Sequence, residues 1–146
     1  MLDLFLAIGH HLLIFGLFGV LALEFAIVRP GLTPAWVQRI ARIDIWYGLI
    51  AGLILAVGFS RAVFAAKGWV YYSHNLFFWL KLTAFAAIGL LSIRPTLAFI
   101  RWRKAGDTPD STQIAPVRRL LWAELILFAA LPILAAAMAR GYGELG

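Results

Sequence analysis

The sequence predicts an all-α integral membrane protein, a four-transmembrane-helix bundle formed by a single domain. Of its 146 residues, 63% are hydrophobic and only 14% are charged, whereas a soluble domain has about 25% charged residues. The hydrophobic residues fall into four continuous runs, each long enough to cross a hydrocarbon core that requires about 20 helical residues. The runs do not alternate between polar and apolar residues as barrel strands do, so we predict helices.

The four hydrophobic runs cover residues 4–28, 45–64, 76–100 and 120–139. Each is predicted to form one transmembrane helix, with the lipid bilayer as its partner. The first run is too long for the core of a signal peptide and follows Asp3 instead of basic residues, so we expect it to be retained. The runs contain few charged residues or histidines, namely His10, His11, Glu24, Arg61, Lys81, Arg94 and Glu124.

The distribution of basic residues predicts how the bundle is oriented. Eight lie in the segments after the first and third runs: Arg29, Arg39, Arg42, Arg101, Arg103, Lys104, Arg118 and Arg119. Three lie on the opposite side: Arg61, Lys67 and Arg140. Since cytoplasmic loops carry the excess of Lys and Arg, both termini are expected on the outer, periplasmic side of a bacterial inner membrane.

Composition also excludes several classes of function. The chain has no cysteine, so a disulfide framework, a thiolate metal site and a cysteine nucleophile are excluded. Its net charge of +6 does not indicate nucleic-acid binding, because the basic residues lie between apolar runs instead of along one stripe. Gly48 and Gly52 have the spacing that lets membrane helices pack closely. This spacing leaves open whether the protein forms a homo-oligomer.

All three histidines lie toward the predicted outer side. His10 and His11 fall about two turns into the first helix, and His74 falls at the start of the third, which runs in the same direction. Imidazole is an axial ligand of haem iron, so we predict one haem b held by His74 with His10 or His11. A second haem that uses the spare histidine is an alternative. Each histidine taken alone also fits a hydrogen-bonded or interfacial helix residue.

Several residues near the histidines are candidates for contacts with this cofactor. Arg61, Lys67 and Lys81 could pair with haem propionates, since Lys81 follows His74 by seven residues on nearly the same helical face. Trp79 either flanks a planar cofactor or belongs to an interfacial aromatic belt.

A second polar group is predicted at one depth near the cytoplasmic side. Glu24, Arg94 and Glu124 each lie five to seven residues from the basic end of their helix, so Arg94 could pair with one or both carboxylates. The group is either a structural clasp or a proton path or quinone-headgroup site, because ionisable residues inside membranes are costly and often functional. Asp44, at the start of the second run, is interpreted as a helix N-cap or a partner of the helix dipole, and a place in the proton path is the alternative.

Three segments carry a resemblance that covers roughly residues 1 to 140. They are AIGHHLLIFGLFGVLALEFAIVRPGL, IDIWYGLIAGLILAVGFSR and KGWVYYSHNLFFWLKLTAFAAIGLLSIRPTLAFIRWR. They resemble a bacterial family of four-helix inner-membrane proteins catalogued only as a domain of unknown function. The resemblance implies the fold and no reaction.

Two further families show a more distant likeness. The membrane protoporphyrinogen oxidases of haem synthesis are also small four-helix proteins with a haem-binding histidine in helix one. That likeness implies the same part for His10 or His11 and a matching part for the Lys81-Leu82 pair. The copper-resistance membrane proteins are similar in architecture, but Cu(I) prefers Cys and Met ligands, and the only methionines here are Met1 and Met138.

The sequence therefore predicts a haem b-binding inner-membrane protein that carries out electron transfer, or a haem-dependent oxidoreductase. Its small redox substrate would be a quinol, a reactive oxygen species or a porphyrinogen. The alternative is a cofactor-free small transporter or membrane assembly subunit that uses Glu24, Arg94 and Glu124.

Overall fold

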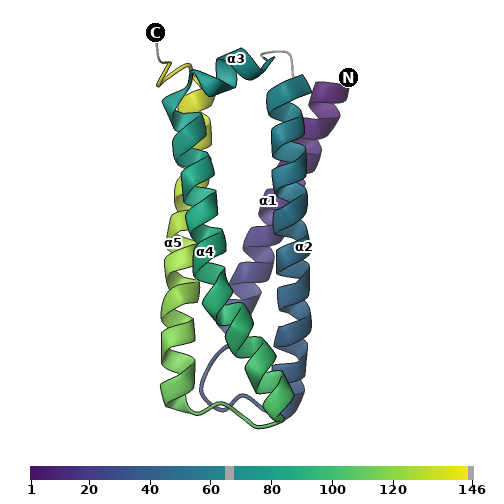
Figure 1. Cartoon of the computed structure of the whole chain (residues 1–146), viewed down its shortest axis with the longest axis vertical. Helices are drawn as coiled ribbons and strands as arrows, with labels where there is room; N and C mark the ends of the chain where they lie inside the picture. Colours follow the sequence, from purple (N-terminus) through teal and green to yellow (C-terminus); the bar gives the residue numbers. More distant parts are fainter. Residues whose placement is uncertain (65–67, 145–146) are drawn as a thin grey trace.

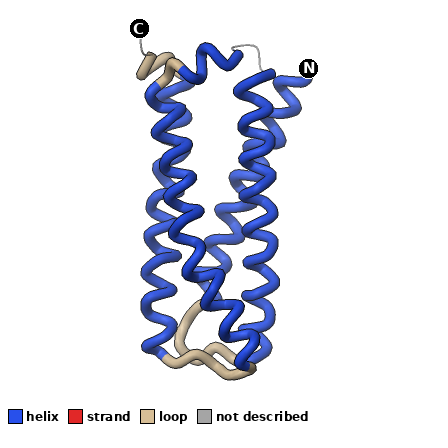
Figure 2. The backbone as a smooth tube through the Cα atoms, in the orientation of Figure 1, coloured by secondary structure: helices blue, strands red, loops and turns tan. Residues whose placement is uncertain are grey.

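The computed structural model describes residues 1–64 and 68–144, and these residues form an all-helical bundle (Figures 1 and 2). The helices are α1 (Leu2–Ile27), α2 (Pro34–Phe64), α3 (Gly68–Ser73), α4 (Leu76–Ala105) and α5 (Ser111–Ala139). Four of them, all except α3, are long and apolar enough to cross a membrane. The predicted four-helix membrane architecture is confirmed to this extent.

The four long helices form a ring in the order α1, α2, α4, α5. The closest pairs are α1 with α2 and α4 with α5, and further contacts join α2 to α4 and α1 to α5. The diagonal pairs, α1 with α4 and α2 with α5, do not pack on each other. A residue can therefore reach a diagonal partner only through the middle of the bundle.

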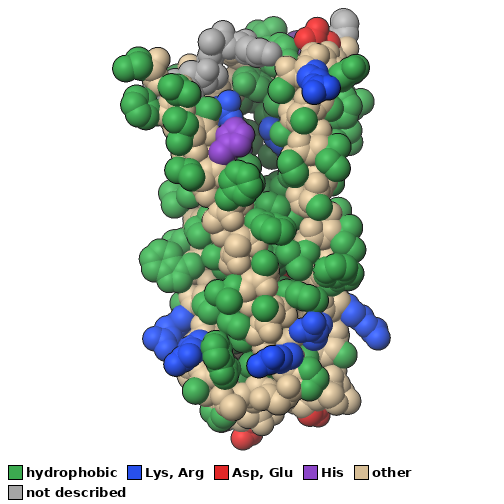
Figure 3. All heavy atoms as spheres, turned by 180° about the vertical axis from the view of Figure 1, so that it is seen from behind, with side chains coloured by type: hydrophobic (Ala, Val, Ile, Leu, Met, Phe, Trp, Pro, Cys, Tyr) green, Lys and Arg blue, Asp and Glu red, His purple; other side chains and the backbone are tan. Residues whose placement is uncertain are grey.

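The two ends of the bundle differ in composition. The terminal end holds α3 and both chain termini, whereas the basic end holds the two loops of residues 28–33 and 106–110 (Figure 1). Lys and Arg side chains gather around the basic end (Figure 3). The largest fully buried side chains include Leu17, Leu21, Ile40, Phe99 and Leu121. The helix pairs separate toward the terminal end (Figure 1), so packing is tightest in the basic half.

Two helices begin well before the predicted hydrophobic runs. α2 starts at Pro34 and α5 at Ser111. Their first turns mix polar or charged residues with buried apolar ones such as Val37 and Ile114, so a search for continuous hydrophobic runs does not detect them. Pro34 suits the first helical position, where a missing N–H costs nothing. Asp110 caps α5 through a capping box with Gln113, a signal that satisfies the free N–H groups of a helix start.

The start of α4 is anchored to the C-terminal segment. The fully buried Asn75 caps α4 by accepting hydrogen bonds from the N–H groups of Phe77 and Phe78. Its Nδ2 donates to the Tyr142 carbonyl at 3.1 Å, and the Leu76 N–H donates to the Gly143 carbonyl at 2.7 Å. Asn75 therefore ties the end of the chain to the terminal end of the bundle.

Candidate functional site

Three carboxylic side chains from three helices are buried in the basic half of the bundle. Glu24 of α1 is 2% exposed, Asp44 of α2 is 8% exposed and Glu124 of α5 is fully buried. Asp44 and Glu124 lie within electrostatic range of Glu24, and Asp44 lies within electrostatic range of Glu124. We call these three residues the carboxyl cluster.

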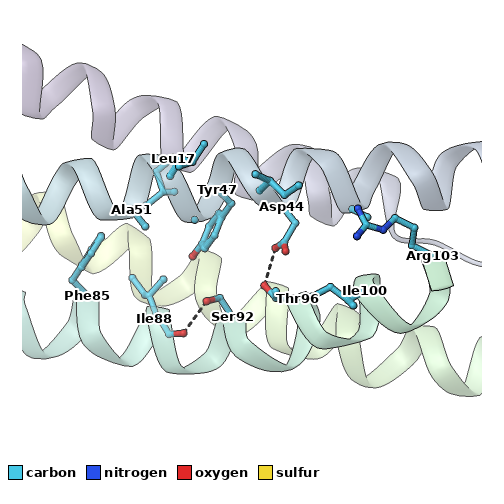
Figure 4. A pocket seen from close by; sticks show the side chains of 15 residues that line it. Leu17, Asp44, Tyr47, Ala51, Phe85, Ile88, Ser92, Thr96, Ile100 and Arg103 are labelled. Atoms are coloured by element: carbon cyan, nitrogen blue, oxygen red, sulfur yellow. Dashed lines mark hydrogen bonds between the residues drawn. The ribbon is translucent and has the colours of Figure 1, made fainter.

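Two hydroxyl groups donate to the carboxyl cluster. The Tyr47 hydroxyl donates to Oε2 of Glu124 at 3.0 Å. The Thr96 hydroxyl donates to Oδ1 of Asp44 at 2.9 Å, as Figure 4 shows. The Oε1 atoms of Glu24 and Glu124 are buried and have no hydrogen-bond partner. A buried polar atom without a partner is costly, so these two oxygens are the chemically unsatisfied part of the site.

The predicted partner of the glutamates lies elsewhere. Arg94 is exposed on α4, and among the described residues no hydrogen bond or ion pair joins it to Glu24 or Glu124. The buried face of α4 is formed by Ile88, Pro95 and Phe99 among others, and Arg94 lies to the side of that face. Arg94 lies at a similar depth to the two glutamates, but its side chain does not point into the bundle, so the predicted pairing is wrong. The third buried member of the group is Asp44.

Asp44 itself has a different role from the one predicted. Because α2 begins at Pro34, Asp44 lies ten residues inside the helix and the N-cap interpretation is wrong. The sequence showed Asp44 and Tyr47 one turn apart, and this spacing was the available signal for their shared face. The pairing of Asp44 with Thr96 could not be read from the sequence, because it depends on how α2 and α4 dock.

Arg118 on α5 reaches α1, where its side chain binds backbone carbonyl groups and not a carboxylate. Nη1 of Arg118 on α5 donates to the carbonyls of Phe25, at 2.9 Å, and of Val28. The guanidinium also lies over the Phe25 ring, 4.3 Å from its centroid. Arg118 thus satisfies the free carbonyls at the end of α1, and the carboxyl cluster has no cation bound to it among the described residues.

A groove of about 470 Å³ lies between α2 and α4 next to the carboxyl cluster (Figure 4). Asp44, Tyr47 and Thr96 line its middle, Phe85 lines it toward the terminal end, and Arg103 lines it at the basic end. The groove therefore leads from the outside of the bundle to Asp44 of the cluster and to Tyr47 and Thr96, which donate hydrogen bonds to it.

The three histidines differ in their surroundings. His10 is half-buried, its ring faces Gly58 of α2, and its buried Nδ1 has no partner. His11 is exposed, with Nδ1 2.7 Å from the Ala7 carbonyl of its own helix. His74 is exposed at the junction of α3 and α4, with Nδ1 2.9 Å from the Val70 carbonyl. Only His10 is turned inward.

The predicted cationic partners lie around His10. Lys81 on α4 and Arg61 on α2 lie within electrostatic range of His10, and Nε of Arg61 is buried without a partner. Figure 3 shows a histidine and Lys or Arg side chains beside a hollow near the terminal end. Lys67 lies outside the described residues. Trp79 is 43% exposed and its Nε1 donates to the Ser73 carbonyl at 2.9 Å.

No three His, Cys, Asp or Glu side chains of residues 1–64 and 68–144 come together as a metal-binding group. His10 lies on α1 and His74 at the junction of α3 and α4, and α1 packs on neither of these two helices. Their joint ligation of one iron stays a prediction, which requires a cofactor wide enough to span the terminal half of the bundle.

Comparison with known proteins gives one match. The model of the family described as "Predicted membrane protein (DUF2214)" matches residues 2–143. Among the curated proteins and the solved structures compared, none matches the chain. The predicted resemblance to a membrane family of unknown function is confirmed, and the likenesses to the protoporphyrinogen oxidases and to the copper-resistance proteins stay predictions. This chain belongs to the DUF2214 family of predicted membrane proteins.

Proposed function

We propose that the protein is a small transporter that carries protons within the membrane, with the carboxyl cluster as the proton-binding site. The observation that carries this proposal is the burial of Glu24 and Glu124, each with one oxygen that has no partner. Leaving charges buried without a cation is very costly, whereas binding protons removes the charge. Ionisable groups of this kind mark proton relays in membrane proteins.

The surroundings of the cluster supply a route for the proton. Asp44 and Tyr47 line the groove, and Tyr47 is hydrogen-bonded to Glu124. A proton that enters along the groove would reach Asp44 first, and the Tyr47 hydroxyl would pass it to Glu124 by donating its own proton and accepting another. Glu24, on which the other two carboxylates act, would complete the relay across the bundle.

The test is proton flux into liposomes that contain the purified protein and a trapped pH-sensitive dye, driven by a potassium diffusion potential. We expect flux well above that of empty liposomes, and at least a tenfold loss in Glu124→Gln and in Glu24→Gln. The control is Glu144→Gln, because Glu144 is exposed near the C-terminus. Flux equal to that of empty liposomes, or unchanged flux in both variants, would favour the membrane assembly subunit and refute proton carriage.

Haem b binding with electron transfer is the second candidate, and His10 favours it. A buried, unpartnered Nδ1 beside Arg61 and Lys81 fits one axial ligand with two cations for propionates, and haem would supply one-electron chemistry. His11 and His74 could ligate only through Nε2, since each Nδ1 lies against a carbonyl of a preceding turn.

An absorption spectrum tests the haem candidate. Protein expressed with ample haem is expected to show a Soret band that shifts on reduction by dithionite. His10→Ala should abolish the band, whereas His11→Ala serves as the matched control from the exposed neighbour. A flat visible spectrum of the folded wild-type protein would refute this candidate.

A further inference from the structure

The groove between α2 and α4 is long enough to hold a lipid acyl chain. On α4 its lining runs from Phe85 to Arg103, about 27 Å of helix at 1.5 Å per residue, and the stretch from Phe85 to Ile100 covers about 22 Å of it. One leaflet of the hydrocarbon core is roughly 15 Å thick. Gly48 and Gly89 have no side chain to fill the groove, and a Cβ atom at either position would stand in open space with no atom within 4 Å.

The hydroxyl groups of the groove are already engaged within the protein. Ser92 donates to the Gly89 carbonyl at 2.8 Å, while Thr96 and Tyr47 donate to the carboxyl cluster. A ligand with a carbonyl headgroup would therefore find no free hydroxyl donor in the body of the groove. An apolar chain needs no hydrogen-bond donor and can pack on the lining, since most of the lining is aliphatic or aromatic.

A cationic side chain of the groove, that of Arg103, lies at its basic end. Arg103 is half-buried and makes no hydrogen bond or ion pair with another described residue. In Figure 4 its guanidinium extends from α4 toward α2, at the end of the groove. Guanidinium matches phosphate with two parallel hydrogen bonds, and basic pockets between transmembrane helices bind anionic lipid headgroups.

From these observations we propose that the groove is a binding site for one anionic phospholipid. An acyl chain lies between α2 and α4 along Phe85, Ile88 and Ile100, and the phosphate is held by Arg103. The site does not depend on proton carriage, since it follows from the shape and charge of the groove alone.

The charge part of this proposal is tested by native mass spectrometry of protein released from nanodiscs made with equal amounts of phosphatidylglycerol and phosphatidylcholine. We expect the wild-type protein to retain one phosphatidylglycerol at least fivefold more often than phosphatidylcholine. Arg103→Gln should lose this preference, while Lys104→Gln, which removes the same charge from an exposed neighbour, should keep it. Equal retention of both lipids by the wild type, or equal loss in both variants, would overturn the proposal.

The groove itself is tested by filling it. Gly89→Leu places a side chain in open space inside the groove and should abolish retention of the lipid without unfolding the protein. The matched control is Gly16→Leu, which adds the same side chain at an exposed and equally open position of α1. Retention by Gly89→Leu equal to that of the control would show that the lipid binds elsewhere and would overturn the proposal.

Discussion

The Tyr47 hydroxyl of α2 donates a 3.0 Å hydrogen bond to Glu124 of α5, across a diagonal of the helix ring. These two helices do not otherwise pack on each other, so the bond joins the two halves of the bundle through its centre. Both side chains are buried, and Glu124 receives no other hydrogen bond from the described residues.

Removal of this bond should therefore destabilise the fold. Tyr47→Phe keeps the ring but leaves both oxygens of Glu124 without a donor, and an unsatisfied buried group costs about 1–3 kcal/mol. Unfolding in detergent, followed by circular dichroism, measures the change. Tyr142→Phe is the control, because Tyr142 is 62% exposed. Equal stability of the two variants would mean that the Tyr47 bond contributes nothing.

Glu24 should show the opposite effect on stability. Its Oε1 is buried without a partner, so Glu24→Leu exchanges an unsatisfied polar group for an apolar one of similar size. We expect the free energy of unfolding to rise by about 1–3 kcal/mol, while proton flux falls. A less stable Glu24→Leu protein would indicate that Glu24 has a stabilising partner in the membrane-embedded protein.

Asp110 should make the start of α5 sensitive to acid. The Thr112 hydroxyl and the Gln113 N–H donate to its carboxylate and hold the pKa of Asp110 below its usual value. A group with a lowered folded pKa contributes stability above its unfolded pKa of about 3.9, and this is lost as the pH falls through the folded value.

Hydrogen exchange measures this effect directly. Protection of the Gln113 and Ile114 amides should fall between pH 5 and pH 3 in the wild-type protein, after correction for intrinsic exchange rates. In Asp110→Ala the protection should be low throughout and independent of pH over this range. Wild-type protection that does not change with pH would contradict the capping role.

The orientation prediction is tested by labelling, since the chain has no cysteine and a single one can be placed at will. Asp107→Cys lies in the exposed loop at the basic end, and Glu144→Cys is exposed at the terminal end. We expect a membrane-impermeant maleimide to label Glu144→Cys in intact spheroplasts, and Asp107→Cys only after permeabilisation. The reverse pattern would place the termini in the cytoplasm.

The helical architecture could be predicted because the length of a hydrophobic run can be read directly along the sequence. The third run begins at the residue where α4 begins, and all four runs lie within or nearly within helices. The first turns of α2 and α5 interleave polar or charged residues with core residues such as Val37, Ile40 and Ile114, so run length did not detect them.

The candidate site was only partly predictable for a related reason. Glu24 and Glu124 stood out because carboxylates in apolar runs are rare, and they do belong to one buried group. Their partner was misassigned, because the choice between Arg94 and Asp44 depends on which face of α2 and α4 turns inward. Depth along a helix follows from sequence position, whereas the docking of helices follows from packing.

The protonation state of the carboxyl cluster tests the central claim most directly. Infrared spectroscopy of the reconstituted protein at neutral pH should show the carbonyl stretch of protonated carboxylic acids, with the expected shift in D₂O. The band should weaken in Glu24→Gln and in Glu124→Gln and weaken further in the double variant, whereas Glu144→Gln should leave it unchanged. A wild-type spectrum without this band would mean that the cluster is ionised at rest, and would contradict the account of Glu24 and Glu124 as proton carriers.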